Sequence, residues 1–276
     1  MTTWFITGCS TGLGRAFADA VLARGHHAVV TARDVSRVGD LAQDHPDTAL
    51  PLALDVTDDE QVTAAVAAAQ ERFGSIDVLV NNAGYGYRAA VEEGEDDAVR
   101  RLFDTHLFGA ARTIKAVLPG MRARRSGTIV NLSSIGARLS PEGSGYYAAA
   151  KAAVEALTLS LRKELAPLGI TAMVVEPGAF RTDFAGRSLT QSARPIADYA
   201  RTAGRRRKEH DTVHGTQSGD PAKAATALID VVESGRAPYL LLLGNDASDA
   251  FRSALDALRD EVDTWESTSR GTDLAP

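Results

Sequence analysis

The stretch Thr7-Gly8-Cys9-Ser10-Thr11-Gly12-Leu13-Gly14 lies between a short apolar run, Trp4–Thr7, and a segment with helical periodicity, Leu13–Arg24. Its glycines permit a tight turn and let the backbone approach a pyrophosphate, while the following helix N-terminus offers free N–H groups and a positive dipole end. Glycines also mark ordinary turns, but the position between a first strand and a helix is the context of a phosphate loop. The stretch therefore predicts nucleotide binding, with contacts from Gly8, Ser10, Thr11, Gly12, Leu13 and Gly14.

Strand-like and helix-like segments alternate along the rest of the chain. We expect strands at Trp4–Thr7, Ala28–Ala32, Ala49–Leu54, Val78–Asn81, Thr128–Leu132, Thr171–Glu176 and Tyr239–Leu243. Several of them are apolar throughout, as in a parallel sheet that is covered on both faces. We expect helices at Leu13–Arg24, Asp59–Phe73, Asp96–Leu118, Tyr147–Ala166, Pro221–Ser234 and Ala247–Trp265. This alternation predicts one α/β domain over residues 1–276, a Rossmann-type doubly wound parallel sheet of about seven strands flanked by helices.

Composition excludes several classes of function. The net charge of −6 argues against a nucleic-acid-binding protein, which usually carries a basic balance. Cys9 is the one cysteine, so no internal disulfide can form and a reducing compartment fits. The N-terminus does not resemble a signal peptide, and the densest apolar run, Tyr239–Leu243, is too short to span a bilayer. The six histidines show no ligand spacing, so we expect no metal site. We expect a cytoplasmic protein without a membrane segment.

The end of the second strand bears on the choice of dinucleotide. In NAD-binding folds an acidic residue here holds the ribose 2′-hydroxyl, whereas an arginine nearby accepts a 2′-phosphate. Ala32 stands at the acidic position and Arg33 follows it, which predicts NADP(H) rather than NAD(H). Asp34 is one residue later and would reverse the prediction if the register shifted by one. The alternative is that Arg33 is only a solvated loop residue.

Tyr147 and Lys151 lie four residues apart in an expected helix, and therefore on one face of it. A free tyrosine has a pKa of about 10 and is a poor acid–base catalyst near neutral pH. A cation beside the phenol lowers that pKa. Such pairs also occur by chance on exposed helix surfaces, so the pair gains its meaning from the other motifs.

Further motifs follow the later strands in a fixed order. They are Asp55-Val56, Asn81-Asn82-Ala83-Gly84, Asn131-Leu132-Ser133-Ser134 and Pro177-Gly178-Ala179-Phe180-Arg181-Thr182. Together with the glycine loop and the tyrosine–lysine pair, they make residues 2–182 resemble the short-chain dehydrogenase/reductase family. Ser134 stands 13 residues before Tyr147, the usual separation of the catalytic serine in that family. Thr31-Ala32-Arg33 and the longer C-terminal part are most similar to the subgroup of bacterial carbonyl reductases and hydroxysteroid- and retinol-dehydrogenase-like enzymes.

The resemblance implies an assignment for each motif. Asp55 and Val56 would contact the adenine, Asn82, Ala83 and Gly84 would line the cofactor, and Pro177, Gly178, Phe180 and Thr182 would border the nicotinamide amide. Tyr147 would give a proton to a carbonyl oxygen during reduction or remove it from an alcohol during oxidation. Lys151 would hold the nicotinamide ribose and, with the oxidised nicotinamide ring, lower the pKa of Tyr147. Ser134 would hydrogen-bond the substrate oxygen.

His106 departs from the family pattern. The family usually has an asparagine at this position, which holds a water that links the catalytic lysine to solvent. Histidine can also donate, accept and carry protons, but it is bulkier, and protonation would place a like charge near Lys151. Three interpretations stay open: a working substitute in the relay, a tolerated change that slows turnover, or a change introduced in an engineered or impaired variant.

The segment from Phe184 to Gly219 is polar, is rich in Arg and Ser, and lacks a clear strand. We interpret residues 184–219 as a lid over the active-site mouth, with a short helix near Ile196–Ala203. Within it, Arg205-Arg206-Arg207-Lys208 is either an anion site or a solvated loop face. Substrate-binding candidates are Ser134, Tyr85, Tyr87, Leu139 and Phe184, because they flank the motifs at the carboxyl edge of the sheet. Core packing is the alternative for these apolar residues.

The sequence thus predicts an NADP(H)-dependent oxidoreductase that interconverts a ketone or aldehyde and an alcohol, on a small and apolar substrate. The competing hypothesis is a cofactor-binding regulatory protein that has lost catalysis, which His106 favours and the intact Ser134, Tyr147 and Lys151 oppose. Relatives often pair through the two long helices, Asp96–Leu118 and Tyr147–Ala166. We therefore expect a homodimer or homotetramer.

Overall fold

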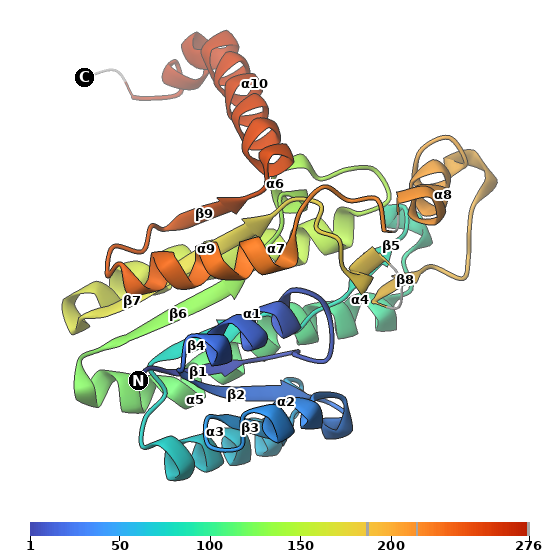
Figure 1. Cartoon of the computed structure of the whole chain (residues 1–276). Helices are drawn as coiled ribbons and strands as arrows, with labels where there is room; N and C mark the ends of the chain where they lie inside the picture. Colours follow the sequence, from blue (N-terminus) through green and yellow to red (C-terminus); the bar gives the residue numbers. More distant parts are fainter. Residues whose placement is uncertain (186–187, 214, 275–276) are drawn as a thin grey trace.

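Seven strands form one parallel sheet at the centre of the computed structural model, which describes residues 1–185, 188–213 and 215–274 (Figure 1). The strand order is β3-β2-β1-β4-β6-β7-β9. These strands are β1 (Thr3–Ile6), β2 (His27–Ala32), β3 (Ala49–Ala53), β4 (Val78–Asn81), β6 (Gly127–Leu132), β7 (Ile170–Pro177) and β9 (Leu240–Leu243). Because β1 lies between β2 and β4, the order reverses there, and ligands bind at such a switch point, beyond the carboxyl ends of the strands.

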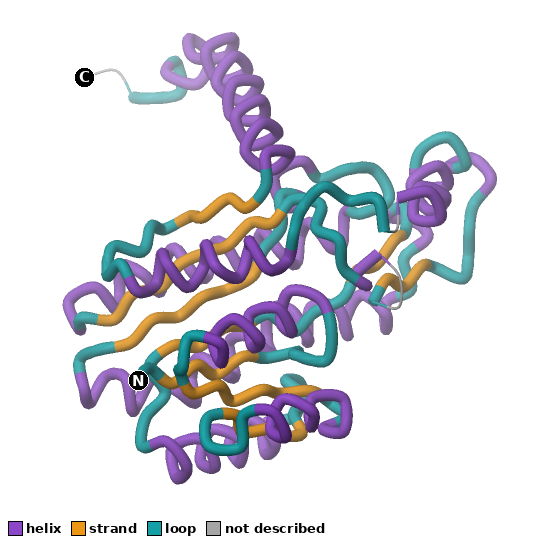
Figure 2. The backbone as a smooth tube through the Cα atoms, viewed as in Figure 1, coloured by secondary structure: helices purple, strands orange, loops and turns teal. Residues whose placement is uncertain are grey.

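Helices cover both faces of this sheet, as Figure 2 shows. One face packs against α1 (Gly12–Ala23), α2 (Gly39–Asp44) and α9 (Pro221–Glu233). The other packs against α3 (Asp59–Phe73), α5 (Gly109–Arg124) and α7 (Gly145–Leu165). Successive strand residues alternate between the two cores: Trp4 and Ile6 belong to the first, and Phe5 to the second. Burial on both sides explains why the strands are apolar throughout, and it confirms the predicted doubly wound fold.

The expected helix Asp96–Leu118 is instead built from three pieces. They are α4 (Asp96–Phe103), a π-helical turn η3 (Asp104–Phe108), and α5, which continues to Arg124. A π turn inserts one extra residue into a helix and is frequent at functional sites. Nothing in the local sequence predicts this turn, because η3 contains neither Pro nor Gly.

The lid segment holds more regular structure than its sequence indicated. A short strand, β8 (Leu189–Gln191), pairs in parallel with β5 (Gly86–Arg88) outside the main sheet. The short helix expected at Ile196–Ala203 is only a 3₁₀ turn, η6 (Ala197–Tyr199), and the longer helix α8 (Ala203–Val213) follows it. The expectation that the lid has no strand was wrong, because β8 is stabilised by pairing with β5, about a hundred residues earlier in the chain. Residues 186–187 and 214 of the predicted lid lie outside the described residues.

Short elements complete the chain: α6 (Gly136–Leu139) and the 3₁₀ turns η1 (Val35–Val38), η2 (Val91–Glu93), η4 (Ala166–Leu168) and η5 (Asp183–Ala185). The last helix, α10 (Asn245–Arg270), begins at the carboxyl edge of the sheet and projects away from the body (Figure 1). Within the described chain, no helix has the length and apolar character needed to cross a membrane.

Candidate active site

The glycine loop joins β1 to α1 at the switch point. Gly8 and Gly12 have φ angles of +73° and +66°, in the left-handed region that favours glycine. A Cβ on Gly14 would lie 2.3 Å from Asn82 Nδ2, so the helix can start here only without a side chain. Thr11 precedes α1 without capping it through its side chain, which leaves first-turn N–H groups for a ligand.

Asn82 ties this loop to the end of β4. Its Nδ2 donates to Thr7 O at 2.9 Å and Gly8 O at 3.0 Å, and the Thr7 hydroxyl accepts from the Asn82 and Ala83 N–H groups. From the other side Thr182 approaches, since a Cβ on Gly12 would lie 3.6 Å from Thr182 Cβ. The cradle of glycines, free N–H groups and flanking motifs fits a dinucleotide phosphate.

Arg33 and Asp34, at the end of β2, differ in what they can offer a cofactor. The Asp34 carboxylate accepts hydrogen bonds from Ser36 N at 3.1 Å and Ser36 Oγ at 2.7 Å, and thereby caps η1. These bonds lower the pKa of Asp34. Arg33 is exposed beside it. At the end of β3, Asp55 likewise uses its carboxylate to accept from Thr57 N and Oγ, and Val56 is buried.

Buried amides connect β4 and β6 to the helices behind the site. Asn81 Nδ2 donates to Asn131 Oδ1 at 2.9 Å, and Asn131 Nδ2 donates to Thr158 Oγ at 2.8 Å. The Thr113 hydroxyl donates to Asn81 Oδ1 at 2.6 Å. Sequence reasoning missed Thr113 and Thr158. The available signal was a buried asparagine in each strand, since such a group requires partners.

Tyr147, Ser134 and Lys151 meet at the carboxyl edge of the sheet. A hydrogen bond joins the Tyr147 and Ser134 side chains. Lys151 is buried, its Nζ lies 5.9 Å from the centre of the Tyr147 ring, and it donates to Leu132 O at 2.7 Å. The structure therefore brings together the three residues that the motifs singled out.

Burial has the largest effect on the pKa values of Tyr147 and Lys151. It raises the pKa of Tyr147 to about 12, against the hydrogen bond from Ser134 and the positive charge of Arg88, which lower it. Burial also lowers the pKa of Lys151 to about 7, although the Glu155 carboxylate opposes this. The sequence predicted Lys151 as the cation that tunes Tyr147. Arg88, which sequence reasoning missed, is a further cation near Tyr147, and its charge lowers the pKa of the phenol.

His106 reaches the site from the π turn η3 and is buried. Its Nε2 lies 3.1 Å from Tyr85 N and 2.8 Å from Tyr85 O, and its ring meets the Tyr147 ring edge-on, with centres 5.7 Å apart. Burial, and then the charge of Lys151, lower the pKa of His106 well below its usual value, so the ring is neutral near pH 7. A Cβ on Gly84 would lie 2.4 Å from His106 Cε1, so the glycine makes room for the ring.

A small cavity lies behind the tyrosine and the lysine. It has a volume of about 10 Å³ and is lined by Thr7, Val56, Asn81, Ala83, Thr105, His106, Ala110, Leu132, Lys151 and Val154. This is about the size of one water molecule. His106 Nδ1 is shielded from solvent and has no hydrogen-bond partner among the described residues. A polar cavity with an unpaired imidazole nitrogen and an ammonium is suited to one bridging water.

The expected substrate-binding residues are not equivalent. The Phe184 ring lies 6.0 Å from the Tyr147 ring and is 40% exposed, so it borders the reacting edge. The Tyr85 ring lies 5.7 Å from the His106 ring. Tyr87 is only 3% exposed and packs against Tyr146, which places it in the core beneath the site. Leu139 is exposed at the end of α6.

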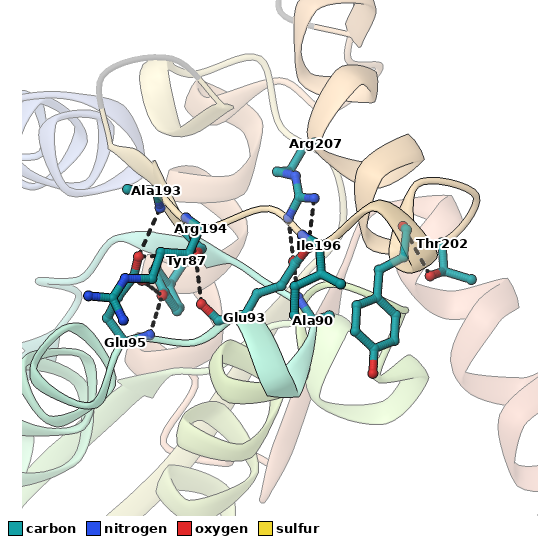
Figure 3. A network of polar contacts seen from close by, with 11 residues as sticks. Tyr87, Ala90, Glu93, Glu95, Ala193, Arg194, Ile196, Thr202 and Arg207 are labelled. Atoms are coloured by element: carbon teal, nitrogen blue, oxygen red, sulfur yellow. Dashed lines mark hydrogen bonds and ion pairs between the residues drawn. The ribbon is translucent and has the colours of Figure 1, made fainter.

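Two glutamates, the buried Glu93 and the half-buried Glu95, hold the lid segment against the body (Figure 3). Glu93 Oε1 accepts from Arg207 Nη2 at 3.0 Å and from Ile196 N at 2.8 Å, and its Oε2 accepts from Ala90 N. Arg207 is the main cause that lowers the pKa of Glu93 to about 2. We call this contact the lid clamp. The basic run lies on the helix α8 rather than on a loop. Its three arginines, Arg205, Arg206 and Arg207, form ion pairs, while Arg205 and Lys208 stay exposed to solvent.

Glu95 adds a second attachment. It accepts from the Tyr87 hydroxyl, from Ser192 Oγ at 3.0 Å and from Ala193 N at 2.9 Å. The hydrogen bond from Tyr87 is the first cause that lowers the pKa of Glu95 to about 2. Sequence reasoning missed Glu93 and Glu95, since nothing local distinguishes them from other surface glutamates.

A further ionic cluster lies behind Lys151. Glu155 Oε1 accepts from Ser133 Oγ at 2.5 Å, and Arg138 binds both Glu155, at 2.6 Å, and Glu176, at 3.3 Å. Burial, with the Glu155 charge second, raises the pKa of Glu176 to about 8. The Arg138 guanidinium also lies 5.3 Å from the centre of the Phe251 ring, which connects the cluster to α10.

Comparisons with known proteins agree with this geometry. A family model described as short chain dehydrogenase matches residues 2–193. The chain is 38% identical to oxidoreductase BOA17 of Botryotinia fuckeliana, with 96% of this chain and 97% of that protein covered. It is 33% identical to a 3-oxoacyl-[acyl-carrier-protein] reductase of Vibrio harveyi, with coverage of 85% and 91%.

Solved structures give the same result. A short-chain dehydrogenase from Streptomyces avermitilis superimposes with a TM-score of 0.92 at 43% identity, covering 99% of this chain and 98% of that one. A 3-ketoacyl-(acyl-carrier-protein) reductase from Brucella melitensis in complex with NADH has a TM-score of 0.74 at 25% identity, with coverage of 87% and 95%. An alcohol dehydrogenase from Thermococcus sibiricus in complex with 5-hydroxy-NADP has 0.70 at 26%, with coverage of 88% and 95%.

Fold and site together define an oxidoreductase of Rossmann type. The chain belongs to the short-chain dehydrogenase family.

Proposed function

We propose that the protein is an NADP(H)-dependent reductase of ketones or aldehydes that also runs in the alcohol-oxidising direction. The observation that carries the proposal is the Tyr147 hydroxyl, hydrogen-bonded to Ser134 and beside Lys151, at the carboxyl edge next to the glycine loop. An acid, a hydrogen-bond donor and a cation around one point are what carbonyl reduction requires.

Each residue has a defined part in this reaction. Ser134 donates to the substrate oxygen and orients it, and Tyr147 transfers a proton to the same oxygen during reduction. Lys151 favours the tyrosinate through its charge, and holds the cofactor ribose. When bound, the nicotinamide supplies or accepts the hydride. Because burial raises the pKa of Tyr147 to about 12, proton transfer near neutral pH depends on positive charge beside the phenol.

In this scheme His106 holds the water through which protons reach Lys151, and does not give up a proton of its own. It is neutral near pH 7, and its unpartnered Nδ1 lies at the cavity that Lys151 also lines. A water in that cavity would join the two groups. The neutral ring avoids the like charge that a protonated histidine would place beside the lysine.

The preference for NADP(H) rests on the contrast between Arg33 and Asp34. Asp34 already uses one carboxylate oxygen to cap η1, whereas Arg33 is exposed. A guanidinium forms bidentate contacts with a phosphate, which an exposed arginine at this position can offer. Asp55 and Val56 for the adenine, and Pro177, Gly178, Phe180 and Thr182 for the nicotinamide amide, complete the proposed cofactor site.

The wider context of the protein is also proposed. Cys9 is buried and unpaired, in keeping with a reducing, cytoplasmic location. Exposed apolar side chains on the long helices, Phe108, Leu157 and Leu159, support pairing of subunits there, as a homodimer or homotetramer.

A panel of ketones and aldehydes, assayed with NADPH and NADH by absorbance of the reduced nicotinamide, tests the proposal. We expect turnover with NADPH, and a higher kcat/KM than with NADH. The competing function, a regulatory protein without catalysis, predicts tight NADPH binding and no turnover of any substrate in the panel.

A further inference from the structure

The side chains on the two faces of β5 contact different parts of the molecule. Tyr87 points into the core, against the ring of Tyr146. Gly86 points the other way, because a Cβ there would lie 2.5 Å from Leu189 Cδ1 and 3.5 Å from Phe184 Cε1. Phe184 in turn lies against Tyr147. Residues two apart in a strand share a face, so Arg88 projects with Gly86 toward the lid and the reacting edge.

Two of the three nitrogens of the half-buried Arg88 side chain are shielded from solvent and unpaired. Its Nε and Nη1 atoms are buried, and neither has a hydrogen-bond partner among the described residues. The charged groups that face it are Arg206, Glu209 and Tyr147. The nearest carboxylate in this set, that of Glu209, binds Arg206 at 2.6 Å. Burial, and then Arg206, lower the pKa of Arg88 to about 10, so it keeps its charge at neutral pH.

Arg207 and Arg138 differ from Arg88 because each has a carboxylate partner. Arg207 binds Glu93, and Arg138 binds Glu155 and Glu176. Leaving a charge buried without a partner costs several kcal/mol, so such a charge is normally balanced by an anion. Arg88 stands beside the proposed proton donor, in the space that the lid covers, where a substrate would enter.

We propose that Arg88 binds a carboxylate group of the substrate, so that the carbonyl compound reduced at Tyr147 is an oxo acid. This inference rests on the proposed function and names its substrate class. A carboxylate matches the single planar fork of one guanidinium with two parallel hydrogen bonds. A phosphate carries more negative charge and would demand further donors, whereas the site adds the carboxylate of Glu209.

The kinetic test uses linear oxo acids of increasing chain length, each compared with its neutral primary amide. For the best oxo acid, Arg88→Met should lower kcat/KM by about 10- to 100-fold, as expected for lost hydrogen bonds to a charged group. Turnover of the matching amide should fall much less, because it loses only the positive charge beside Tyr147 and no hydrogen bond to the substrate. Arg205→Met is the control, because Arg205 lies on the same lid helix but pairs with Glu142 at the surface. Equal losses for acid and amide in Arg88→Met would overturn the proposal.

A binding test separates this inference from the proposed function. Calorimetry with NADP⁺-loaded wild-type protein should show tighter binding of hexanoate than of hexanamide, and Arg88→Met should abolish the difference. If wild type turns over no ketone but keeps this selectivity, the proposed reaction fails and the carboxylate site stands. If hexanoate binds no better than hexanamide, or inorganic phosphate displaces hexanoate, the carboxylate site is refuted.

Stability gives a third readout. A structural arginine would destabilise the protein when replaced, whereas an uncompensated buried charge does not. Arg88→Met should therefore keep or raise the Tm, and a lower Tm for this variant would contradict the inference.

An independent observation concerns α10. Phe251 lies under Arg138 where the helix leaves the body, and Leu255, Leu258, Val262 and Trp265 continue the same alternating spacing of four and three residues. The last four are between 46% and 59% exposed. This is the pattern of a two-stranded coiled coil that lacks its second strand. The stripe, which we call the α10 seam, is about 21 Å long.

We infer that the α10 seam pairs with the α10 seam of a second copy, in antiparallel orientation. Centred on Leu258, this arrangement sets Phe251 against the partner's Trp265 and Leu255 against the partner's Val262. It also brings Arg252 beside the partner's Glu266, in a complementary pair that occurs twice, while Arg259, which already pairs with Asp256, faces its own copy. A parallel arrangement would instead place Glu261 beside the partner's Glu266, which repel each other. The acidic balance of the helix, seven Asp and Glu against three Arg, disfavours an anionic membrane as the occupant.

Sedimentation equilibrium over a range of protein concentration tests the pairing. Leu258→Glu should remove one association step, whereas Thr264→Glu, on the opposite side of the helix, should not. Arg252→Glu should weaken the pairing, and the added change Glu266→Arg should restore it. Trp265 emission should shift to the blue as wild type associates, because Trp4, the other tryptophan, is already buried. An unchanged mass for Leu258→Glu, or its loss of binding to anionic vesicles alone, would overturn the inference.

Discussion

The cofactor side and the lid side of the site are stabilised by different kinds of interaction. On the cofactor side, backbone shape does most of the positioning: Gly8 and Gly12 adopt left-handed conformations, and Asn82 binds the main-chain oxygens of Thr7 and Gly8. These contacts join the ends of adjacent strands, and none of them requires an ionised group.

On the lid side, charges do the positioning. Glu93 and Arg207 are 114 residues apart in sequence, and Glu95 and Ala193 are 98 apart. The two glutamates each bind the lid through a carboxylate. The contacts on the cofactor side are therefore insensitive to pH over a range in which the lid can be released. Binding of the cofactor and closure over the substrate are thus separable properties of this fold.

The largest effect should come from Tyr147→Phe, which leaves the cofactor side intact and removes the acid. We expect kcat to fall by about 10³-fold, within the range for loss of a general acid. The Kd for NADPH, measured by fluorescence titration, should stay the same. Substantial residual turnover would place the proton donor elsewhere and break the separation of the two sides.

Glu93→Gln should release the lid without affecting the cofactor. Breaking one partner of a buried ion pair costs about 3 kcal/mol, because Arg207 is left uncompensated. Hydrogen exchange of residues 189–207 should become faster, and KM for the substrate should rise. Glu142→Gln is the matched control, since the pair of Glu142 and Arg205 is exposed and contributes little to stability.

The same clamp has a defined pH dependence. The pKa of Glu93 is lowered to about 2, from an ordinary value of 4.5. Its stabilisation is therefore complete above about pH 4.5 and is lost as the pH falls toward 2. Exchange of residues 189–207 in wild type should accelerate over this window. If hydrogen exchange of residues 189–207 showed the same pH dependence in Glu93→Gln as in wild type, Glu93 would be excluded as the cause of that dependence.

On the cofactor side, Arg33→Ala should change the selectivity between the two nicotinamide cofactors. We expect the ratio of kcat/KM for NADPH over NADH to fall by about 10-fold, the effect of losing a hydrogen bond to a charged group. Lid exchange should not respond. An unchanged ratio would show that Arg33 does not contact the 2′-phosphate.

The smallest effect is expected for His106→Asn, which replaces one hydrogen-bonding group by another. Because the pKa of His106 is lowered, its protonation should contribute an acidic limb to the pH–rate profile well below pH 6.5. This limb should be absent from His106→Asn, while the rate near neutral pH changes less than in the other variants. Identical profiles for the two proteins would exclude His106 from the proton relay.

The sequence predicted the two sides unequally for a physical reason. Neighbouring residues in the sequence determine the seven strands, the glycine loop and the Tyr147–Lys151 pair, because these features depend on local backbone geometry and regular spacing. Arg88, Glu93 and Arg207 depend on which distant segments meet in space. A lone arginine after a tyrosine carries no sign that its partner is missing, so only the fold reveals it.

The π turn Asp104–Phe108 has a consequence for the long helix that contains it. One extra residue turns the later part by about 100° relative to an uninterrupted α-helix. Leu102, before the turn, packs with Tyr87 near the lid, whereas Val117, after it, packs beneath the sheet against Leu79 and its neighbours. The two parts of the long helix therefore turn their apolar faces in different directions. His106 lies in the π turn between them and reaches the site from there.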